Sequence, residues 1–372
     1  MGKSKSIKCK KSKCNKLKEK KIRKLKEKKI KNIKSKDIQN NNNSEEMVDI
    51  TKDNILQCKT AGNYANLVFS GGSIKGISFC GVLDVLNKRN ILYDNTGKLK
   101  ITGIAGASAG SIFATLFAIG YTPDEIKDII MTTDFGTLLD YPKIFDIPNI
   151  AKDAENLIKN YGLCPGRAEL KFLGTLIKNK VGDEDYTIQQ LFDNTGVKLV
   201  IVTTNMNTQL PVYFCPNASD PSYSNIPIRK AIGMSTSIPF VFEPVLFNGD
   251  LHADGGILDN YPIHAFDSDI PNNLLNIKTV EPNPHTLGFR IASEVTTGRT
   301  EIKSLYDCTS CLLSALLDFP EEVVVGLPWN SLRTINVVTQ SYSVTNFSLT
   351  DEQKIDLINS GITSTDNFFS SQ

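Results

Sequence analysis

The sequence predicts an α/β protein, a three-layer α/β/α sandwich with a mostly parallel central sheet. Short apolar runs of β-prone residues alternate along the chain with segments whose apolar residues recur at helical spacing, the order expected for a sheet covered by helices. The run from Val197 to Thr203 is dense in β-branched residues, which is typical of an inner strand covered on both faces. With 372 residues, 40% hydrophobic and 22% charged, the chain is long enough to bury a large core.

The order of the elements follows from the same patterns. The first strand stops at Gly71 and Gly72, and apolar residues at helical spacing follow it. A later helix starts with Thr122 as its N-cap and Pro123 at its first position, where a missing amide hydrogen does no harm. We expect strands at 66–70, 100–104, 197–203, 245–247 and 287–291, and helices at 74–92, 109–119, 123–131 and 302–317.

The uncharged run from Ile101 to Gly120 has about the length that a bilayer needs, so a membrane span is one interpretation of it. Against this interpretation, the run holds four glycines and five alanines, with a Gly-Ala-Ser-Ala-Gly break near its first third. A buried strand, a turn and a helix explain the run better.

The break itself, Gly106-Ala-Ser108-Ala-Gly110, is a Gly-x-Ser-x-Gly pattern between a predicted strand and a predicted helix. In a nucleophile elbow this turn forces the serine into a strained conformation that only small neighbours tolerate, and it exposes the hydroxyl in front of a helix N-terminus. The alternative is a tightly packed, apolar helix start. The flanking strand and helix favour the elbow.

Two further glycine-rich turns carry candidate chemistry. The loop from Ser70 to Gly76 follows a strand and opens a helix, so its amide groups can face an anion, as an oxyanion hole or a phosphate cradle requires. The glycine pattern of a phosphate-binding P-loop is absent from it. Asp254-Gly255-Gly256 can turn the chain sharply and present a carboxylate. Each of the two segments, taken alone, is also explained by an ordinary turn.

Together, in this order, the three segments resemble the patatin-like phospholipase family. That family has a glycine-rich oxyanion loop, then a Gly-x-Ser-x-Gly elbow, and much later an Asp-Gly-Gly or Asp-Gly-Ala. The resemblance runs over about residues 62–370, with supporting similarity at 202–208, 234–244, 259–262 and 346–361.

The resemblance implies a lipid acyl hydrolase with a Ser–Asp dyad, in which Ser108 is the nucleophile, Asp254 is the base and an acyl-enzyme forms. It implies no metal or organic cofactor, and a membrane lipid or phospholipid as substrate. The implied oxyanion loop, elbow and Asp-Gly-Gly residues are Gly71, Gly72, Ser73, Lys75 and Gly76, then Gly106 and Gly110, then Gly255 and Gly256.

Two alternatives stay open beside this reading. A carboxylate of ordinary pKa is a weak base for a serine hydroxyl, so an α/β-hydrolase triad that uses His252 or His264 is the rival enzyme. The second alternative is a noncatalytic protein that keeps the scaffold and binds lipid or nucleic acid. The feature that hints at it is Ser73, which stands where the family's oxyanion loop has a glycine, in a place where the backbone can need a conformation that favours glycine.

The N-terminal region differs from the rest of the chain. Residues 1–36 hold 18 of the 42 Lys and Arg, a net charge of +16, whereas the rest of the chain carries −14. With the polar run at 39–44, this predicts a basic, disordered tail and linker at 1–60 and a hydrolase domain at 61–372, whose motifs lie in 66–266. Gly2 lies in a possible myristoylation signal, Met-Gly-Lys-Ser-Lys-Ser, and a polybasic tail is the usual second membrane signal.

Cysteine usage bears on the compartment. The eight cysteines are few for a disulfide scaffold of this length, and no signal peptide is recognisable before them. Cys308 and Cys311 have the spacing of half a zinc site, but the sequence offers no second pair. We therefore expect an intracellular, cytoplasmic protein that is attached to membranes, and the resemblance does not favour nucleic acid as a partner.

Overall fold

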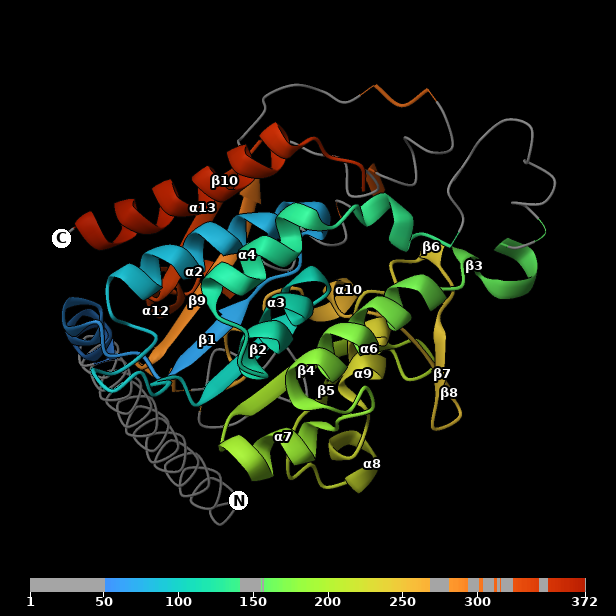
Figure 1. Ribbon diagram of the computed structural model, residues 1–372, viewed down its shortest axis with the longest axis horizontal. Coiled ribbons are helices and arrows are strands. Elements are labelled where there is room, and N and C mark those ends of the chain that lie inside the picture. The colour runs from blue at the N-terminus through green and yellow to red at the C-terminus, as the bar shows by residue number, and fades with distance from the viewer. Residues whose placement is uncertain are drawn as a thin grey trace, which may run out of the picture. The chain divides into compact units, whose positions relative to one another are not determined.

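An eight-stranded mixed sheet forms the centre of the fold (Figure 1). The computed structural model describes residues 51–140, 155, 157–267, 281–293, 301–303, 311–312, 315, 324–340 and 347–371. Residues Asn54–Gln372 form one compact unit, to which the sheet belongs, and Met1–Asp53 form another.

Five neighbouring strands of the sheet run parallel. In spatial order they are β10 (Thr334–Thr339), β9 (Thr286–Ser293), β1 (Asn66–Phe69), β2 (Gly103–Ala107) and β4 (Lys198–Asn205). Antiparallel pairing extends the sheet through β8 (Asp250–Asp254) and β7 (Val245–Phe247), and β5 (Leu210–Phe214) also pairs with β4. The predicted, mostly parallel central sheet is confirmed, and the antiparallel part was not foreseen.

Strand β4 has three partners, and this determines how the sheet is built next to the glycine-rich turns. β2 pairs with β4 up to Ala107 opposite Val202, and β8 takes over at the next step with Asp254 opposite Thr203. β5 pairs along 201–205 and thus occupies the other edge. Because a strand has only two edges, β2 and β8 must follow each other along the same edge of β4.

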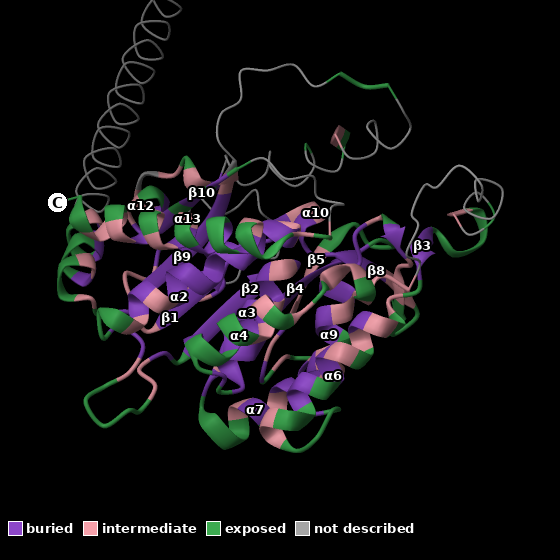
Figure 2. Cartoon of the chain, turned by 45° about the horizontal axis from the view of Figure 1, so that its top comes forward, coloured by how far each residue is buried: buried purple, intermediate pink, exposed green. Residues whose placement is uncertain are grey.

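One face of the sheet is covered by the larger layer of helices. Leu67 and Phe69 of β1 point into this core, as the two-residue period of a strand requires. Figure 1 shows α2, α3 and α4 over this face, and Figure 2 shows that the strands beneath them are buried. The main helices are α2 (Phe79–Lys88), α3 (Ala109–Ala118), α4 (Pro123–Thr132), α6 (Arg167–Val181), α7 (Ile188–Thr195), α9 (Ile228–Ser235) and α13 (Asp351–Ser370).

The opposite face carries a smaller cluster. In this cluster, apolar side chains of the sheet pack against residues of later segments. The sheet contributes Val68, Ala105 and Val200, and the later segments contribute Tyr261, Ile263, Ala265 and Val324. This layer includes α10 (Gly256–Asp259) and α12 (Pro328–Leu332). The remaining short elements are the 3-10 helices η1 (Ser73–Ser78) and η2 (Phe135–Leu138), the helix α8 (Pro221–Ser224) and the paired strands β3 (Gly162–Cys164) and β6 (Phe240–Phe242).

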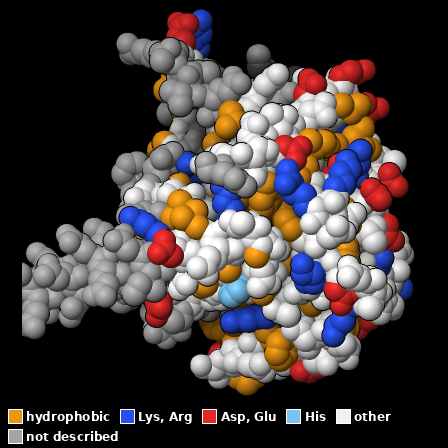
Figure 3. Space-filling model, turned by 90° about the vertical axis from the view of Figure 1, so that its left-hand side faces the viewer, with side chains coloured by type: hydrophobic (Ala, Val, Ile, Leu, Met, Phe, Trp, Pro, Cys, Tyr) orange, Lys and Arg blue, Asp and Glu red, His pale blue; other side chains and the backbone are white. Residues whose placement is uncertain are grey.

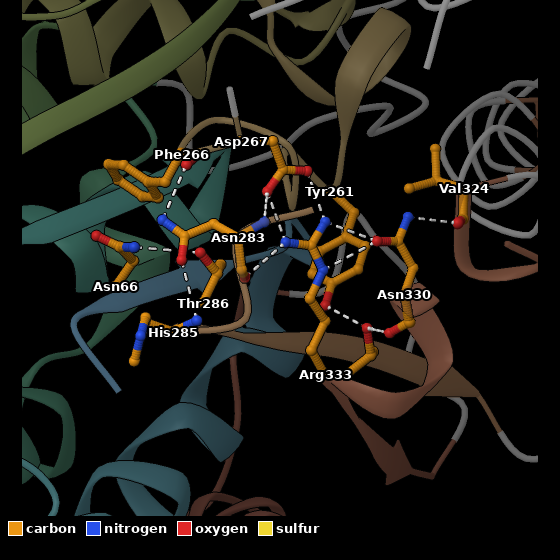
Figure 4. A network of polar contacts seen from close by, with 11 residues as sticks. Asn66, Tyr261, Phe266, Asp267, Asn283, His285, Thr286, Val324, Asn330 and Arg333 are labelled. Atoms are coloured by element: carbon orange, nitrogen blue, oxygen red, sulfur yellow. Dashed lines mark hydrogen bonds and ion pairs between the residues drawn. The ribbon is translucent and has the colours of Figure 1, made fainter. Parts of the chain in front are cut away.

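A buried arginine holds three segments of this smaller layer together (Figure 4). Arg333, only 1% exposed, donates to both carboxylate oxygens of Asp267 at 2.6 and 2.7 Å and to Oδ1 of Asn330. The Asn283 amide donates to Asp267 Oδ1 at 2.8 Å. A buried charge needs such a complete set of partners, so the network keeps the segments at 267, 283 and 330 in one arrangement.

Most predicted elements form within a few residues of their expected bounds. The strand expected at 100–104 instead starts at Gly103, and the helix expected at 74–92 is split into η1 and α2. The uncharged run at 101–120 becomes β2, a turn and α3. Among the described residues, no helix combines the length and the apolar character needed to cross a membrane. Most of the helix expected at 302–317 lies outside the described residues.

Candidate active site

Ser108 lies in a sharp turn between the end of β2 and the start of α3. Its φ of 49° and ψ of −131° place a non-glycine residue in a sparsely populated region, which costs of the order of 1–3 kcal/mol. A Cβ on Gly106 would lie 2.4 Å from the Gly110 carbonyl oxygen, and one on Gly110 would lie 2.4 Å from that of Phe69. The two glycines of the motif are therefore needed for close backbone approach around the strained serine.

The elbow brings Ser108 directly against Asp254. The Ser108 hydroxyl donates to Oδ2 of Asp254 at 2.6 Å, and the Gly256 amide donates to Oδ1 at 2.7 Å. The two residues are 146 positions apart, and they meet because β2 and β8 end at consecutive steps of β4. Gly255 passes close to β4, since a Cβ there would lie 2.2 Å from the Val202 oxygen.

Burial changes the acidity of Asp254. Its side chain is 0% exposed, and desolvation raises its pKa from the ordinary 3.8 to about 7. The hydrogen bonds from Ser108 and Gly256 act in the opposite direction, since both stabilise the ionised form. The outcome is a carboxylate that is a far better proton acceptor than an exposed aspartate.

A second serine, which the sequence did not single out, supports the elbow. Ser235 Oγ accepts a hydrogen bond from the Ser108 amide at 2.9 Å and donates to the Val202 carbonyl at 2.6 Å. The Asp254 amide donates to the Ser237 carbonyl at 2.9 Å. The segment at 234–244, which carried part of the family resemblance without a role, thus contacts both Ser108 and Asp254.

The glycine-rich loop at 71–76 lies next to Ser108. A Cβ on Gly71 would stand 3.0 Å from Ser108 Cβ. The Gly71 amide donates to the Asn260 carbonyl at 2.9 Å and the Lys75 amide to the Gly72 carbonyl at 3.1 Å, so these two of the five expected groups are engaged. The Gly72 amide donates to no acceptor within the described part of the chain. This amide therefore has its hydrogen available for a ligand.

Ser73 and Gly76 complete this loop. Ser73 has a φ of 51°, in the left-handed region that favours glycine, so the serine adopts the conformation that the sequence left in question. Gly76 is buried inside η1, and a Cβ there would lie 3.2 Å from the Cβ of Ala109 in the elbow.

A cavity of about 90 Å³ opens beside Ser108. Its wall is mostly aliphatic and aromatic and includes residues of η1, α3, α4, η2, α6 and β6, with Ser73, Ser108, Glu169 and Thr236 as its polar members. The apolar residues are Ile74, Ile77, Ala109, Ile112, Phe113, Leu116, Ile129, Ile130, Phe135, Leu138, Leu139, Phe172, Leu173, Ile238, Phe242 and Phe347. A hydrocarbon chain suits such a wall.

The three histidines are all engaged away from Ser108. His252 Nδ1 lies 3.1 Å from the Thr203 hydroxyl, and burial lowers the pKa of its ring. His264 Nε2 lies 3.2 Å from the Tyr213 hydroxyl and 3.4 Å from the Asp259 carboxylate. His285 Nδ1 lies 2.9 Å from the Asn63 carbonyl oxygen. Asp254 thus occupies the place at the Ser108 hydroxyl that a triad histidine would take.

Some predicted sites fall outside the described residues, namely Gly2 with the basic tail and Cys308. Within the described residues, no group of three or more His, Cys, Asp and Glu side chains is arranged to hold a metal ion.

Residues 67–267, more than half of the chain, match the model of the patatin-like phospholipase family. The chain belongs to this family. The matched range contains the glycine-rich loop, the elbow and the Asp-Gly-Gly segment.

Two viral proteins are among the relatives of this patatin-like chain. Protein R571 of Acanthamoeba polyphaga mimivirus, whose function is uncharacterised, is 35% identical over 56% of the chain. Probable lipid hydrolase 463L of Invertebrate iridescent virus 6 is 30% identical over 54% of the chain. The matches span 63% and 62% of these relatives' own lengths, so the chain covers less than two thirds of either protein.

A solved structure shares the patatin-like fold. VipD from Legionella pneumophila superposes with a TM-score of 0.52 at 20% identity, over 83% of this chain and 67% of VipD. At this level of identity the likeness concerns the fold alone.

Proposed function

We propose that this protein is a lipid acyl hydrolase that cleaves carboxylic esters through a Ser108–Asp254 dyad and an acyl-enzyme. The observation that carries the proposal is the 2.6 Å hydrogen bond from the Ser108 hydroxyl to the Asp254 carboxylate beside an apolar cavity. Membership of a phospholipase family and the name of the relative 463L support a lipid as substrate.

In the first half-reaction, Ser108 Oγ attacks the ester carbonyl carbon while its proton passes to Asp254. The carbon–oxygen bond to the alcohol then breaks, and the alcohol leaves with the proton that Asp254 returns. In the second half, Asp254 takes a proton from water, the resulting hydroxide attacks the acyl carbon, and the proton returns to Ser108. The fatty acid leaves, and the dyad is restored.

The environment suits these roles. A base is most effective when its pKa is near the working pH, and burial brings the pKa of Asp254 to about 7. The negative oxygen of the tetrahedral intermediate needs amide donors, and the Gly72 amide together with the N-terminus of α3 supports such an assignment. The apolar cavity accepts the acyl chain.

Two observations weigh against the alternatives. A Ser–His–Asp triad requires a histidine at the serine hydroxyl, but Ser108 donates directly to Asp254. For nucleic acid, acidic and basic side chains are interspersed on the face shown in Figure 3, and the chain beyond residue 36 carries a net charge of −14. The chain beyond the basic tail therefore does not favour binding to a phosphate backbone.

The proposal is tested by replacing Ser108 with alanine and measuring hydrolysis of p-nitrophenyl butyrate, with Ser360→Ala on α13 as a matched control. We expect at least about a thousandfold loss for Ser108→Ala and no loss for the control, because only the nucleophile forms the acyl-enzyme. A fluorophosphonate probe should label the wild type and fail to label Ser108→Ala. Undiminished turnover by the variant would refute the proposal, and a comparable loss in His252→Asn would favour the triad.

We also propose that the basic tail attaches the protein to anionic membranes inside the cell. Each Lys or Arg near such a surface contributes about 1 kcal/mol, so a fraction of the 18 in residues 1–36 suffices. Deleting residues 1–50 should abolish sedimentation with phosphatidylserine vesicles and preserve butyrate ester hydrolysis. Equal sedimentation of the truncated and full chains would exclude a role for the tail.

A further inference from the structure

The proposed mechanism does not use one buried acidic residue that lines the cavity. Glu169 lies on α6, is 8% exposed and lines the same cavity as Ser108. Its neighbours on this side of the helix, Phe172 and Leu173, follow at the i+3 and i+4 positions and are apolar cavity residues as well. A carboxyl group therefore stands where the pattern of the helix and the lining of the pocket both favour an apolar side chain.

The start of the helix does not explain the acid. Asp140 already accepts hydrogen bonds from the first amides of α6, at 2.5 Å from Arg167 N and 2.8 Å from Ala168 N. Asp140 thus accepts the hydrogen bonds from the free backbone amides at the start of the helix that an acidic side chain in the first turn often accepts. A buried polar group without a structural purpose is costly, which points to a purpose in the cavity.

Thr236 lines the same cavity as Glu169, and its hydroxyl donates to the Ile232 carbonyl at 3.0 Å. This hydroxyl oxygen also acts on the carboxyl group of Glu169, whose pKa it lowers. Thr236 directly follows Ser235, whose hydroxyl accepts from the Ser108 amide at 2.9 Å. The charge of Asp254 also acts on Glu169. Glu169 and Thr236 thus line one cavity together with Ser108, and Thr236 belongs to the segment that contacts the Ser108 amide.

The protonation of Glu169 fits a neutral ligand. Desolvation, with smaller contributions from Asp254 and Asp140, raises the pKa of Glu169 to about 7, so a large fraction is uncharged near neutral pH. A neutral carboxylic acid both donates and accepts a hydrogen bond, and the Thr236 hydroxyl, whose proton goes to the Ile232 carbonyl, can accept one. The natural complement of this pair is an uncharged hydroxyl group, since a ligand phosphate would be repelled by the ionised fraction.

We propose that Glu169 and Thr236 form a subsite that binds a free hydroxyl group of the lipid substrate, so that the enzyme prefers hydroxyl-bearing esters. The inference rests on the proposed acyl hydrolase function. The hydroxyl belongs either to the alcohol part, as in a partly acylated glycerol, or to the acyl chain. Because Thr236 directly follows the residue that contacts the Ser108 amide, the alcohol part is favoured.

Three esters of the same chain length separate these sources. Propyl decanoate has no free hydroxyl, the monoester of decanoic acid with propylene glycol has one next to the ester, and propyl hydroxydecanoate has one at the chain end. We expect the wild type to favour one hydroxyl ester over propyl decanoate at least about tenfold in kcat/KM, because a site built for a hydroxyl rejects the analogue that lacks it. The preferred ester identifies the source.

Variants connect the preference to the subsite. In Glu169→Leu the preference should fall to about one, with slower turnover of the hydroxyl ester and faster turnover of propyl decanoate. Glu169→Gln keeps a donor and an acceptor and should retain most of the preference, and Thr236→Val should reduce it. The control is Glu184→Gln, which removes a half-exposed acid. Arg229, the partner of Glu184, still pairs with Asp185 at 2.8 Å in this variant.

Two results would overturn the subsite: a wild type without preference among the three esters, or a preference that survives in Glu169→Leu. Both leave the hydrolase proposal intact, because they presuppose turnover. Failure of the wild type to hydrolyse p-nitrophenyl butyrate or any of the three esters would instead remove the proposed function itself, and the subsite with it.

Discussion

Replacing Asp254 with asparagine should stabilise the protein at alkaline pH. The pKa of Asp254 is raised from 3.8 to about 7 because its ionised form is desolvated. The stabilising contribution of such a group is complete below pH 3.8 and is lost as the pH rises through 7. Above that pH, the folded protein bears the full cost of a buried negative charge, which asparagine removes.

The magnitude follows from the shift. About three pKa units at roughly 1.4 kcal/mol each give a gain of about 4 kcal/mol for Asp254→Asn at pH 8. At pH 5, where the folded-state group is mostly protonated, the same linkage gives only about 2 kcal/mol. Asparagine fits the site, since its oxygen can accept from the Gly256 amide and its amide group can face the Ser108 hydroxyl.

The assay is equilibrium unfolding in urea at pH 5 and pH 8, with Asp193→Asn as a control because Asp193 is exposed. The gain in free energy of unfolding should be larger at pH 8 than at pH 5 for Asp254→Asn and absent for the control. A gain that does not depend on pH, or a variant less stable than the wild type at pH 8, would refute the reasoning from desolvation. Ester hydrolysis should be lost at both values.

Three further predictions follow from described contacts. The kcat/KM of the wild type for p-nitrophenyl butyrate should rise between pH 5 and 8 with a midpoint near 7, since the base must be ionised; a flat profile would contradict this role of Asp254. Arg333→Met should cost about 3–5 kcal/mol in urea unfolding by leaving Asp267 unpaired, and adding Asp267→Leu should recover part of the loss; a double variant no more stable than the single one would count against the network. Lys354→Met should cost about 1–3 kcal/mol, because Lys354 donates to the carbonyls of Ile130, Met131 and Thr133 at 2.8–3.2 Å; an unchanged unfolding midpoint would deny it this capping role.

Much of the fold could be predicted because local pattern and tertiary structure agree. The β-branched run at 197–203 is strand β4, and Thr122 forms the expected capping box with Glu125. The start of β2 was misplaced because Gly103 and Gly106 have low strand propensity. Pairing with β1 on one edge and β4 on the other holds these glycines in the sheet, and no local signal reports such pairing.

The motif residues of the candidate site could be picked out from the sequence, whereas their surroundings could not. Ser108 and Asp254 stand in glycine-rich turns that a single sequence displays. Ser235 and Glu169 stand in helices with ordinary patterns, so their proximity to the site depends on how α6 and α9 pack beside β4. Which loop amides are engaged also depends on a distant partner, since the Gly71 amide meets the Asn260 carbonyl.

The tandem arrangement of β2 and β8 along β4 makes one peptide step, from Val202 to Thr203, the junction between Ser108 and Asp254, the two residues of the proposed dyad. The helices that line the cavity are separate from this junction. A shift of register on either side of it would separate Ser108 from Asp254, because β-strands slip only in whole residues. If the proposed dyad is catalytic, substitutions in the cavity wall can change the substrate range, whereas strand register fixes the distance between the two side chains.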